Sequence, residues 1–110
     1  MRSKFNAKKT TVDGITFDSA REAKRYQELK LMERAGEIIG LRRQVRFELI
    51  PAFECDGKHY RPTTYIADFT YTDCETGKGI VEDVKGVRTD VYRLKAKLFA
   101  HKFGVAILET

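Results

Sequence analysis

Two short stretches decide the fold of this chain: the letters YIADFTYT at residues 65–72 and GIVEDVK at residues 79–85. Both are rich in β-branched and aromatic residues, which favour strands. The polar, glycine-containing loop between them predicts an antiparallel hairpin. Because side chains alternate along a strand, Asp83 and Lys85 should project from one face about 7 Å apart. The same pairing would bring Asp68 beside Asp83.

Two helices are predicted on either side of this hairpin. Residues 19–35 are strong helix formers with apolar residues three apart, and residues 90–103 form a second such segment with Thr89 or Asp90 as its cap. Each segment is followed by a glycine, the usual residue after a helix end. The residues predicted to form the buried stripe of the second helix are Val91, Leu94, Leu98 and Phe99.

Further strands complete the predicted sheet. Residues 12–17 and 53–60 each carry a central Asp-Gly pair and read as short hairpins, while residues 44–50 alternate between apolar and polar side chains. Residues 105–108 form a short apolar strand after the second helix, and a strand reached by a helical crossover usually lies parallel to its neighbour. This order predicts an α/β (α+β) domain with a central mixed β-sheet flanked by helices.

Length and composition predict one domain. A chain of 110 residues has room for a single core, which we place at residues 12–110, behind a flexible basic arm at residues 1–11. No apolar run approaches the ~20 residues of a membrane span or forms the core of a secretory signal, so we expect a cytoplasmic protein without membrane contact. Cys55 and Cys74 lack the paired ligands of a zinc site and receive no role.

The charge of the chain favours a polyanionic partner. Twenty-one Lys and Arg residues against sixteen Asp and Glu residues leave a net charge of +5. Each phosphate neutralised by a cation releases counterions, which favours DNA binding; on charge alone, a solvated basic face remains the alternative. The three arginines that follow the first helix are expected to lie away from the acidic residues. They could therefore bind the DNA backbone without contacting the bond that is cut. The residues predicted to bind DNA are Lys8, Lys9, Arg42, Arg43, Arg46, Arg93, Lys95 and Lys97.

The two aspartates predict a metal-dependent reaction. An unpaired carboxylate among apolar residues is costly, and two carboxylates side by side repel unless a cation lies between them. Mg²⁺ prefers such oxygen ligands, polarises a phosphate and lowers the pKa of a bound water. The Lys85 ammonium would then orient that water or stabilise the developing charge. The alternative is a surface ion pair between Asp83 and Lys85, with Asp68 as a hydrogen-bonded strand residue.

This pattern resembles a known class of nucleases. An acid at Asp68 followed by Asp83-Val84-Lys85 is similar to the PD-(D/E)xK nuclease superfamily, in which two acids and a lysine lie on adjacent strands, although Ala67 stands where the superfamily name has Pro. Four phrases together resemble, over residues 3–108, a phage-encoded family of Holliday-junction-resolvase-like nucleases long catalogued as a domain of unknown function. They are FDSAREAKRY at residues 17–26, YIADF at 65–69, VEDVKG at 81–86 and LKAKLF at 94–99.

The resemblance implies a restriction-endonuclease-like core and a Mg²⁺ site, with Mn²⁺ as a substitute. The acid that the family carries on a helix matches Glu22, which would join Asp68, Asp83 and the backbone carbonyl of Val84 as a metal ligand. A second explanation for Glu22 stays open, because Ser19 and Glu22 also form the pattern of a capping box, in which the glutamate reaches back to the Ser19 backbone amide.

The expected function is that of a structure-selective DNA endonuclease. The most concrete form is a Holliday junction resolvase in a bacterial host cytoplasm, acting as a homodimer because a two-fold substrate calls for two active sites related by symmetry. A nuclease for other branched or duplex DNA is the first alternative. A DNA-binding module without catalysis is the second alternative, and it leaves the buried acids unexplained.

Overall fold

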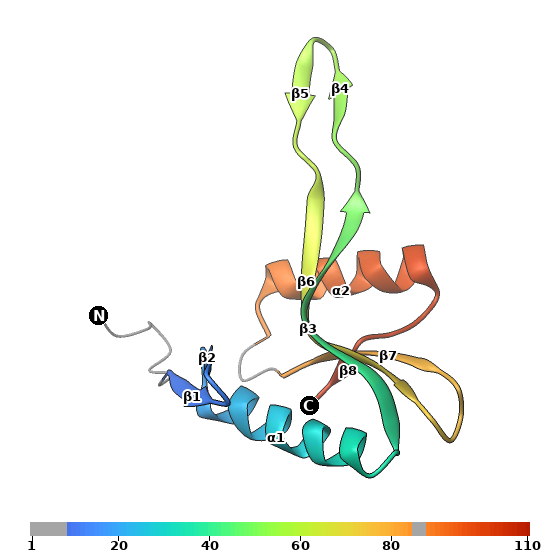
Figure 1. Ribbon diagram of the computed structural model, residues 1–110. Helices are drawn as coiled ribbons and strands as arrows, with labels where there is room; N and C mark the ends of the chain where they lie inside the picture. Colours follow the sequence, from blue (N-terminus) through green and yellow to red (C-terminus); the bar gives the residue numbers. More distant parts are fainter. Residues whose placement is uncertain (1–8, 85–87) are drawn as a thin grey trace.

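The computed structural model describes residues 9–84 and 88–110 of the chain (Figure 1). Its centre is a mixed four-stranded sheet in the order β3-β6-β7-β8. Strands β3 (Ile38–Ile50), β6 (Thr63–Asp73) and β7 (Gly79–Asp83) are antiparallel, and β8 (Leu108–Glu109) runs parallel to β7. The predicted α+β class, the β6–β7 hairpin and the parallel last strand are confirmed. The predicted Lys8 and Lys85 lie outside the described residues.

Two small hairpins form where Asp-Gly pairs predicted them. Strands β1 (Thr10–Val12) and β2 (Ile15–Phe17) flank one pair, and β4 (Phe53–Cys55) and β5 (Lys58–Tyr60) flank the other. Both central residues of each turn have positive φ, which is the backbone of the tight turn that suits the twist of a hairpin. Strand β1 begins two residues before the predicted boundary of the domain.

Helix α1 (Ala20–Arg34) forms as predicted, with Ser19 as its N-cap. The Ser19 hydroxyl accepts a hydrogen bond from the Glu22 backbone amide at 3.1 Å, which satisfies one of the free amides at the helix start. The helix buries Ala23, Tyr26 and Leu29 against the sheet.

Helix α2 (Asp90–Phe103) has the predicted bounds, with Thr89 as its cap, and buries half of the predicted stripe. Phe99 is buried and Leu98 packs against the core as predicted, but Val91 and Leu94 are 64% and 57% exposed, and Tyr92 is buried in their place. Residues 91 and 98 repeat at helical spacing, and so do 92 and 99, so periodicity alone does not choose between the two faces. Burial of the Tyr92 ring is possible because its hydroxyl donates to Glu109 at 2.7 Å.

The third strand is longer than the alternating pattern indicated. Strand β3 starts at Ile38 instead of Gln44, so Arg42 and Arg43 lie inside a strand. The register with β6 shifts between Ile39 and Arg42, near Gly40 with a φ of 72°. Such an irregularity breaks the period of two on which strand prediction depends. The last strand also differs, since it covers Leu108–Glu109 and not residues 105–108.

Beyond the sheet, β3 and β6 continue together into the β4–β5 hairpin, which projects from the body of the molecule (Figure 1). We call residues 51–62 the hairpin arm. At its base Ile50 pairs with Thr63, and where β4 and β5 begin to pair the rings of Phe53 and Tyr60 stack at 4.8 Å while both remain partly exposed.

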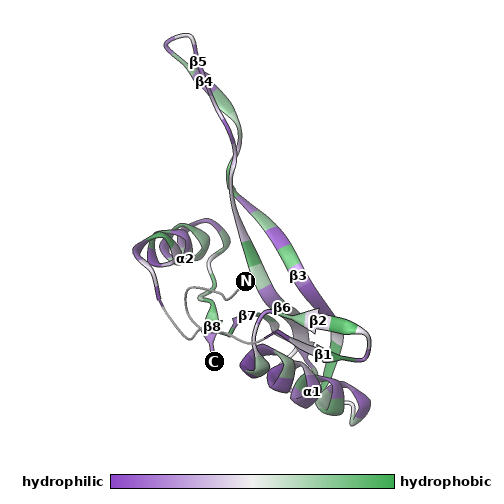
Figure 2. Ribbon diagram, turned by 90° about the vertical axis from the view of Figure 1, so that its left-hand side faces the viewer, coloured by the Kyte–Doolittle hydropathy of each residue, from purple (hydrophilic) through white to green (hydrophobic). Residues whose placement is uncertain are grey.

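The core consists of two clusters, and along β6 the boundary between them falls at Asp68. Phe69 and Tyr71 pack with α1 in the first cluster, whereas Tyr65 and Ala67 pack with α2 in the second. Figure 2 shows the two helices at different sides of the sheet. Among the described residues, no helix is long and apolar enough to span a membrane.

Candidate active site

The predicted acidic residues of β6 and β7 lie side by side. Phe69 pairs with Glu82, so the next position of the antiparallel register sets Asp68 opposite Asp83. The Asp68 carboxylate also accepts a hydrogen bond from the Val84 backbone amide at 2.8 Å. The two carboxyl groups therefore meet at the end of β7, as the hairpin predicted.

Asp83 is held in place by a buried tyrosine. The side chain of Asp83 is 1% exposed, and its Oδ2 accepts a hydrogen bond from the Tyr65 hydroxyl at 2.5 Å. Burial first, and then this carboxylate, raise the pKa of Tyr65, so its hydroxyl remains a donor at every physiological pH. The sequence pattern indicated only a core position for Tyr65; the signal for its role is that a buried tyrosine hydroxyl needs a partner.

Asp68 binds its proton unusually tightly. Burial, followed by the charge and hydrogen bond of Asp83 and a smaller effect of Glu22, raises the pKa of Asp68 to about 7, against the lowering effect of the Val84 amide. Two carboxyl groups this close cannot both carry a full charge without compensation. In this arrangement a proton on Asp68 provides the compensation that a cation could also provide.

Glu22 approaches the same place from α1. It is 8% exposed, and its Oε2 lies 3.5 Å from the Gln44 amide nitrogen and 3.8 Å from the Arg43 guanidinium. The same Gln44 nitrogen lies 3.4 Å from Asp68 Oδ1. The Glu22 backbone thus serves the helix cap while its carboxylate points to the site, and Gln44, which the sequence pattern showed only as a strand residue, connects Glu22 to Asp68.

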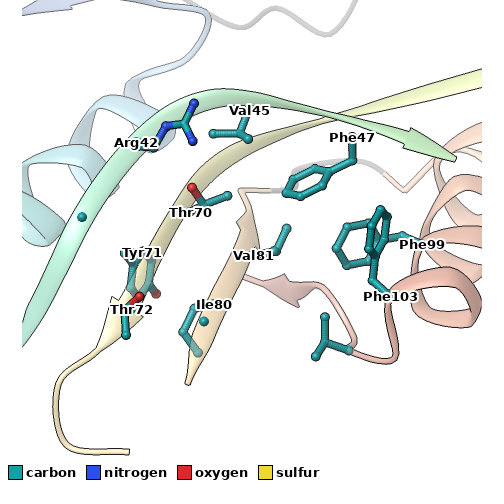
Figure 3. A pocket seen from close by; sticks show the side chains of 13 residues that line it. Arg42, Val45, Phe47, Thr70, Tyr71, Thr72, Ile80, Val81, Phe99 and Phe103 are labelled. Carbon is teal, nitrogen blue, oxygen red and sulfur yellow. The ribbon is translucent and has the colours of Figure 1, made fainter. Parts of the chain in front are cut away.

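Arg43 borders this site, which corrects the expectation that all three central arginines lie away from it. Its guanidinium lies 4.5 Å from the centre of the Phe17 ring and 3.8 Å from the Glu22 carboxylate. Arg42 is exposed instead and lines a groove of about 490 Å³ (Figure 3). The side chains that line this groove include Arg42, Val45, Phe47, Thr70, Tyr71, Thr72, Ile80, Val81, Phe99 and Phe103.

The other predicted DNA-binding residues are distributed over several elements. Arg46 is exposed on β3, Lys97 is exposed on α2 and Lys95 is half-buried there. Lys9 forms an exposed ion pair with Asp18 at 3.6 Å, and Arg93 forms one with Asp90 at 3.3 Å. Exposed pairs of this kind are weak, at about 0 to 1 kcal/mol, so they leave these cations available to a phosphate.

Glu82, next to Asp83, is a structural residue. It is fully buried and accepts hydrogen bonds from Arg25 Nε at 2.6 Å, Tyr71 at 2.6 Å and Thr110 at 2.9 Å. Burial alone would raise the pKa of Glu82, but these donors outweigh burial and hold it below its usual value. The bond to Arg25 joins α1 to β7, the two elements that carry Glu22 and Asp83.

The side chains at the site have the chemistry that a hard divalent cation needs, but hydrogen bonds occupy the space between them. Glu22, Asp68 and Asp83 offer only carboxylate oxygens, the ligands that Mg²⁺ prefers. Within residues 9–84 and 88–110, no three His, Cys, Asp or Glu side chains stand close enough together to hold a metal ion. The Gln44 amide lies between Glu22 and Asp68. A cation would therefore have to replace this amide between the carboxylates.

Comparison with known proteins places the chain in a family. No curated protein and no solved structure matches it. A family model described as "Protein of unknown function (DUF1064)" matches residues 2–108, which is nearly the whole chain. The chain therefore belongs to the DUF1064 family of proteins of unknown function.

Proposed function

We propose that this protein is a metal-dependent DNA endonuclease with a restriction-endonuclease-like core. The observation that carries the proposal is the juxtaposition of the half-buried Asp68 and the buried Asp83 on adjacent antiparallel strands, with Glu22 directed to the same place from α1. Carboxylates brought together out of water destabilise a fold unless a proton, a cation or hydrogen-bond donors compensate their charge. Glu22, Asp68 and Asp83 come from three elements and supply the oxygen donors that a hard cation prefers, once the cation replaces the Gln44 amide between Glu22 and Asp68.

Each residue has a role in this proposal. Glu22, Asp68, Asp83 and the Val84 carbonyl would hold Mg²⁺ or Mn²⁺, which when bound supplies a polarised phosphate and a water of low pKa. Tyr65 keeps Asp83 oriented, because its hydroxyl occupies Oδ2. Lys85 would follow the metal-binding acid and stabilise charge on the reacting phosphate.

The substrate that we propose is branched DNA, most concretely a four-way junction cut by a homodimer. Support comes from the net charge of +5 and from the exposed Arg42 and Arg46 on β3. A four-way junction has two-fold symmetry, so two sites in a symmetric dimer could cut opposite strands.

Cleavage assays test the proposal directly. A labelled four-way junction and a linear duplex of the same sequence are incubated with the protein and Mg²⁺, Mn²⁺ or EDTA, and we expect junction cleavage that requires the metal. Asp83→Asn should abolish cleavage but retain junction binding, because it removes a ligand and a negative charge near the phosphates. Binding without cleavage under all metal conditions would identify a DNA-binding module instead, and equal cleavage of both substrates would remove the junction preference.

A further inference from the structure

Gln44 has a backbone conformation that its position in a strand does not explain. Among the described residues, three that are not glycine have positive φ: Asp13, Asp56 and Gln44, the last with a φ of 52°. Asp13 and Asp56 lie in tight turns, where this conformation is expected. Gln44 lies within β3, between Arg43 and Val45, which pair normally with β6. A residue with a Cβ in this conformation is strained, and such strain is commonly found at functional sites.

The side chain of Gln44 makes use of that conformation. Its amide nitrogen lies 3.5 Å from Glu22 Oε2 and 3.4 Å from Asp68 Oδ1, so one group reaches carboxylates from a helix and from a strand. Both contacts are at the long end of the hydrogen-bond range and are therefore weak. The amide is neutral, so it draws the two acids together and leaves their negative charge in place. A lysine or arginine at this position would cancel that charge.

We propose that Gln44 is a positioning residue of the candidate metal site, held in a strained backbone so that its amide sets the spacing of Glu22 and Asp68 before a cation arrives. This inference rests on the proposed function. Preorganised ligands bind more tightly because less ordering is needed on binding. The weak contacts of the amide can be given up to the cation at small cost, whereas a strong ion pair would compete with it.

Two substitutions separate the backbone from the side chain. Gln44→Gly removes the amide and relieves the strain, since glycine adopts positive φ freely. Gln44→Met keeps the length of the side chain and the strained backbone but removes the donor. Asp56→Gly is the matched control, because it relieves the same kind of strain in the hairpin arm. Affinity for Mn²⁺ alone is measured by titration calorimetry, and the melting temperature is measured on the same metal-free samples.

We expect both Gln44 variants to bind Mn²⁺ at least tenfold more weakly than the wild type. Gln44→Gly should melt at the same temperature as the wild type or higher, Gln44→Met should not melt higher, and Asp56→Gly should leave Mn²⁺ affinity unchanged. This combination of a stable fold and a weakened metal site is not expected of a residue with a purely structural role.

The contrary outcomes are distinguishable. If the wild type binds Mn²⁺ and the Gln44 variants bind it equally well, the role of Gln44 is overturned while the proposed nuclease stands. An equally weakened affinity in Asp56→Gly, or an early melting Gln44→Gly, also overturns the role of Gln44, because either would indicate a general effect on the fold. A wild type that binds no Mn²⁺ overturns this inference and the metal site together.

Discussion

Glu22 serves two neighbours through different atoms. Its backbone amide donates to Ser19 at the start of α1, while its carboxylate lies beside Gln44 and Arg43 in the candidate site. The serine half of the predicted capping box is therefore formed, while the Glu22 carboxylate, which a full box would turn back to the Ser19 amide, lies in the candidate site. A substitution at each partner can separate the cap from the site, because the cap depends on the Ser19 oxygen and the site depends on the Glu22 carboxylate.

We predict that Glu22→Gln loses most of the cleavage activity with little loss of stability, since a glutamine keeps the backbone contact but is a poor Mg²⁺ ligand. The matched variant Ser19→Ala should show the reverse, losing about 0.5 to 2 kcal/mol of stability with activity retained. Urea denaturation and junction cleavage measure the two properties. Full activity in Glu22→Gln would leave the helix cap as the only role of this residue.

The proton on Asp68 predicts a pH-dependent stability. The folded protein holds the pKa of Asp68 at about 7, above its ordinary value of 3.8, so between these values the folded state binds more protons than the unfolded state. The stability due to this proton is complete below the lower value and is lost as the pH rises through about 7.

Asp68→Asn removes this dependence. We predict that the metal-free wild type becomes less stable relative to Asp68→Asn between pH 5 and pH 8, as measured by urea denaturation in EDTA at both pH values. Comparison with the variant cancels the other titrating groups. A difference in unfolding free energy that does not change with pH would show that Asp68 titrates normally.

Among the larger elements, the hairpin arm is the part least connected to the core. Its aromatic pair of Phe53 and Tyr60 is packed ring on ring and remains 46% and 39% exposed. Two-stranded ribbons are marginally stable without further packing, so little of the stability of the body should depend on the arm. The β6–β7 hairpin, by contrast, lies between both core clusters.

We predict that residues 51–62 can be replaced by Asn-Gly without unfolding the protein, because Ile50 and Thr63 are register partners that a two-residue turn can join. The melting temperature should change by a few degrees at most. Phe99→Ala provides the contrast, since its side chain is 1% exposed and its loss should cost about 3 to 5 kcal/mol. A comparable loss in the arm deletion would show that the arm supports the core.

For the molecule as a whole, the positions of the arginines indicate which of them contribute to DNA binding and which affect the cleavage site. Arg42 and Arg46 are exposed on β3, whereas Arg43 is packed on Phe17 beside Glu22. We predict that Arg42→Gln with Arg46→Gln flattens the plot of log DNA affinity against log salt, with the cleavage rate of bound DNA unchanged. The slope should fall by about one for each phosphate that the two arginines neutralise in the wild type.

Arg43→Gln is the control for that experiment. It should lower the cleavage rate of bound DNA more than it changes the salt dependence, because it alters the surroundings of Glu22. If the slope of log DNA affinity against log salt is unchanged in the double variant, DNA contacts other cationic residues, such as those of α2.

The local chemistry of the sequence was sufficient for most elements. Asp-Gly pairs specified two hairpins, Ser19 and Thr89 specified two helix starts, and alternation placed Asp68 and Asp83 on paired strands. Each of these features depends on interactions between residues near one another in the chain, or on a strand pair joined by a short loop. Such interactions can be read from spacing alone.

The sequence by itself therefore determined the order of the elements, the α+β class and the acidic pair at the end of β7. Only the tertiary structure decided which face of α2 is buried, where β3 begins, and that Gln44, Arg43 and Tyr65 surround the acids. The physical reason is that these features depend on contacts between distant segments. Two helical faces of similar hydrophobicity are distinguished only by what packs against them, and a strained residue is tolerated only where its neighbours hold it in place.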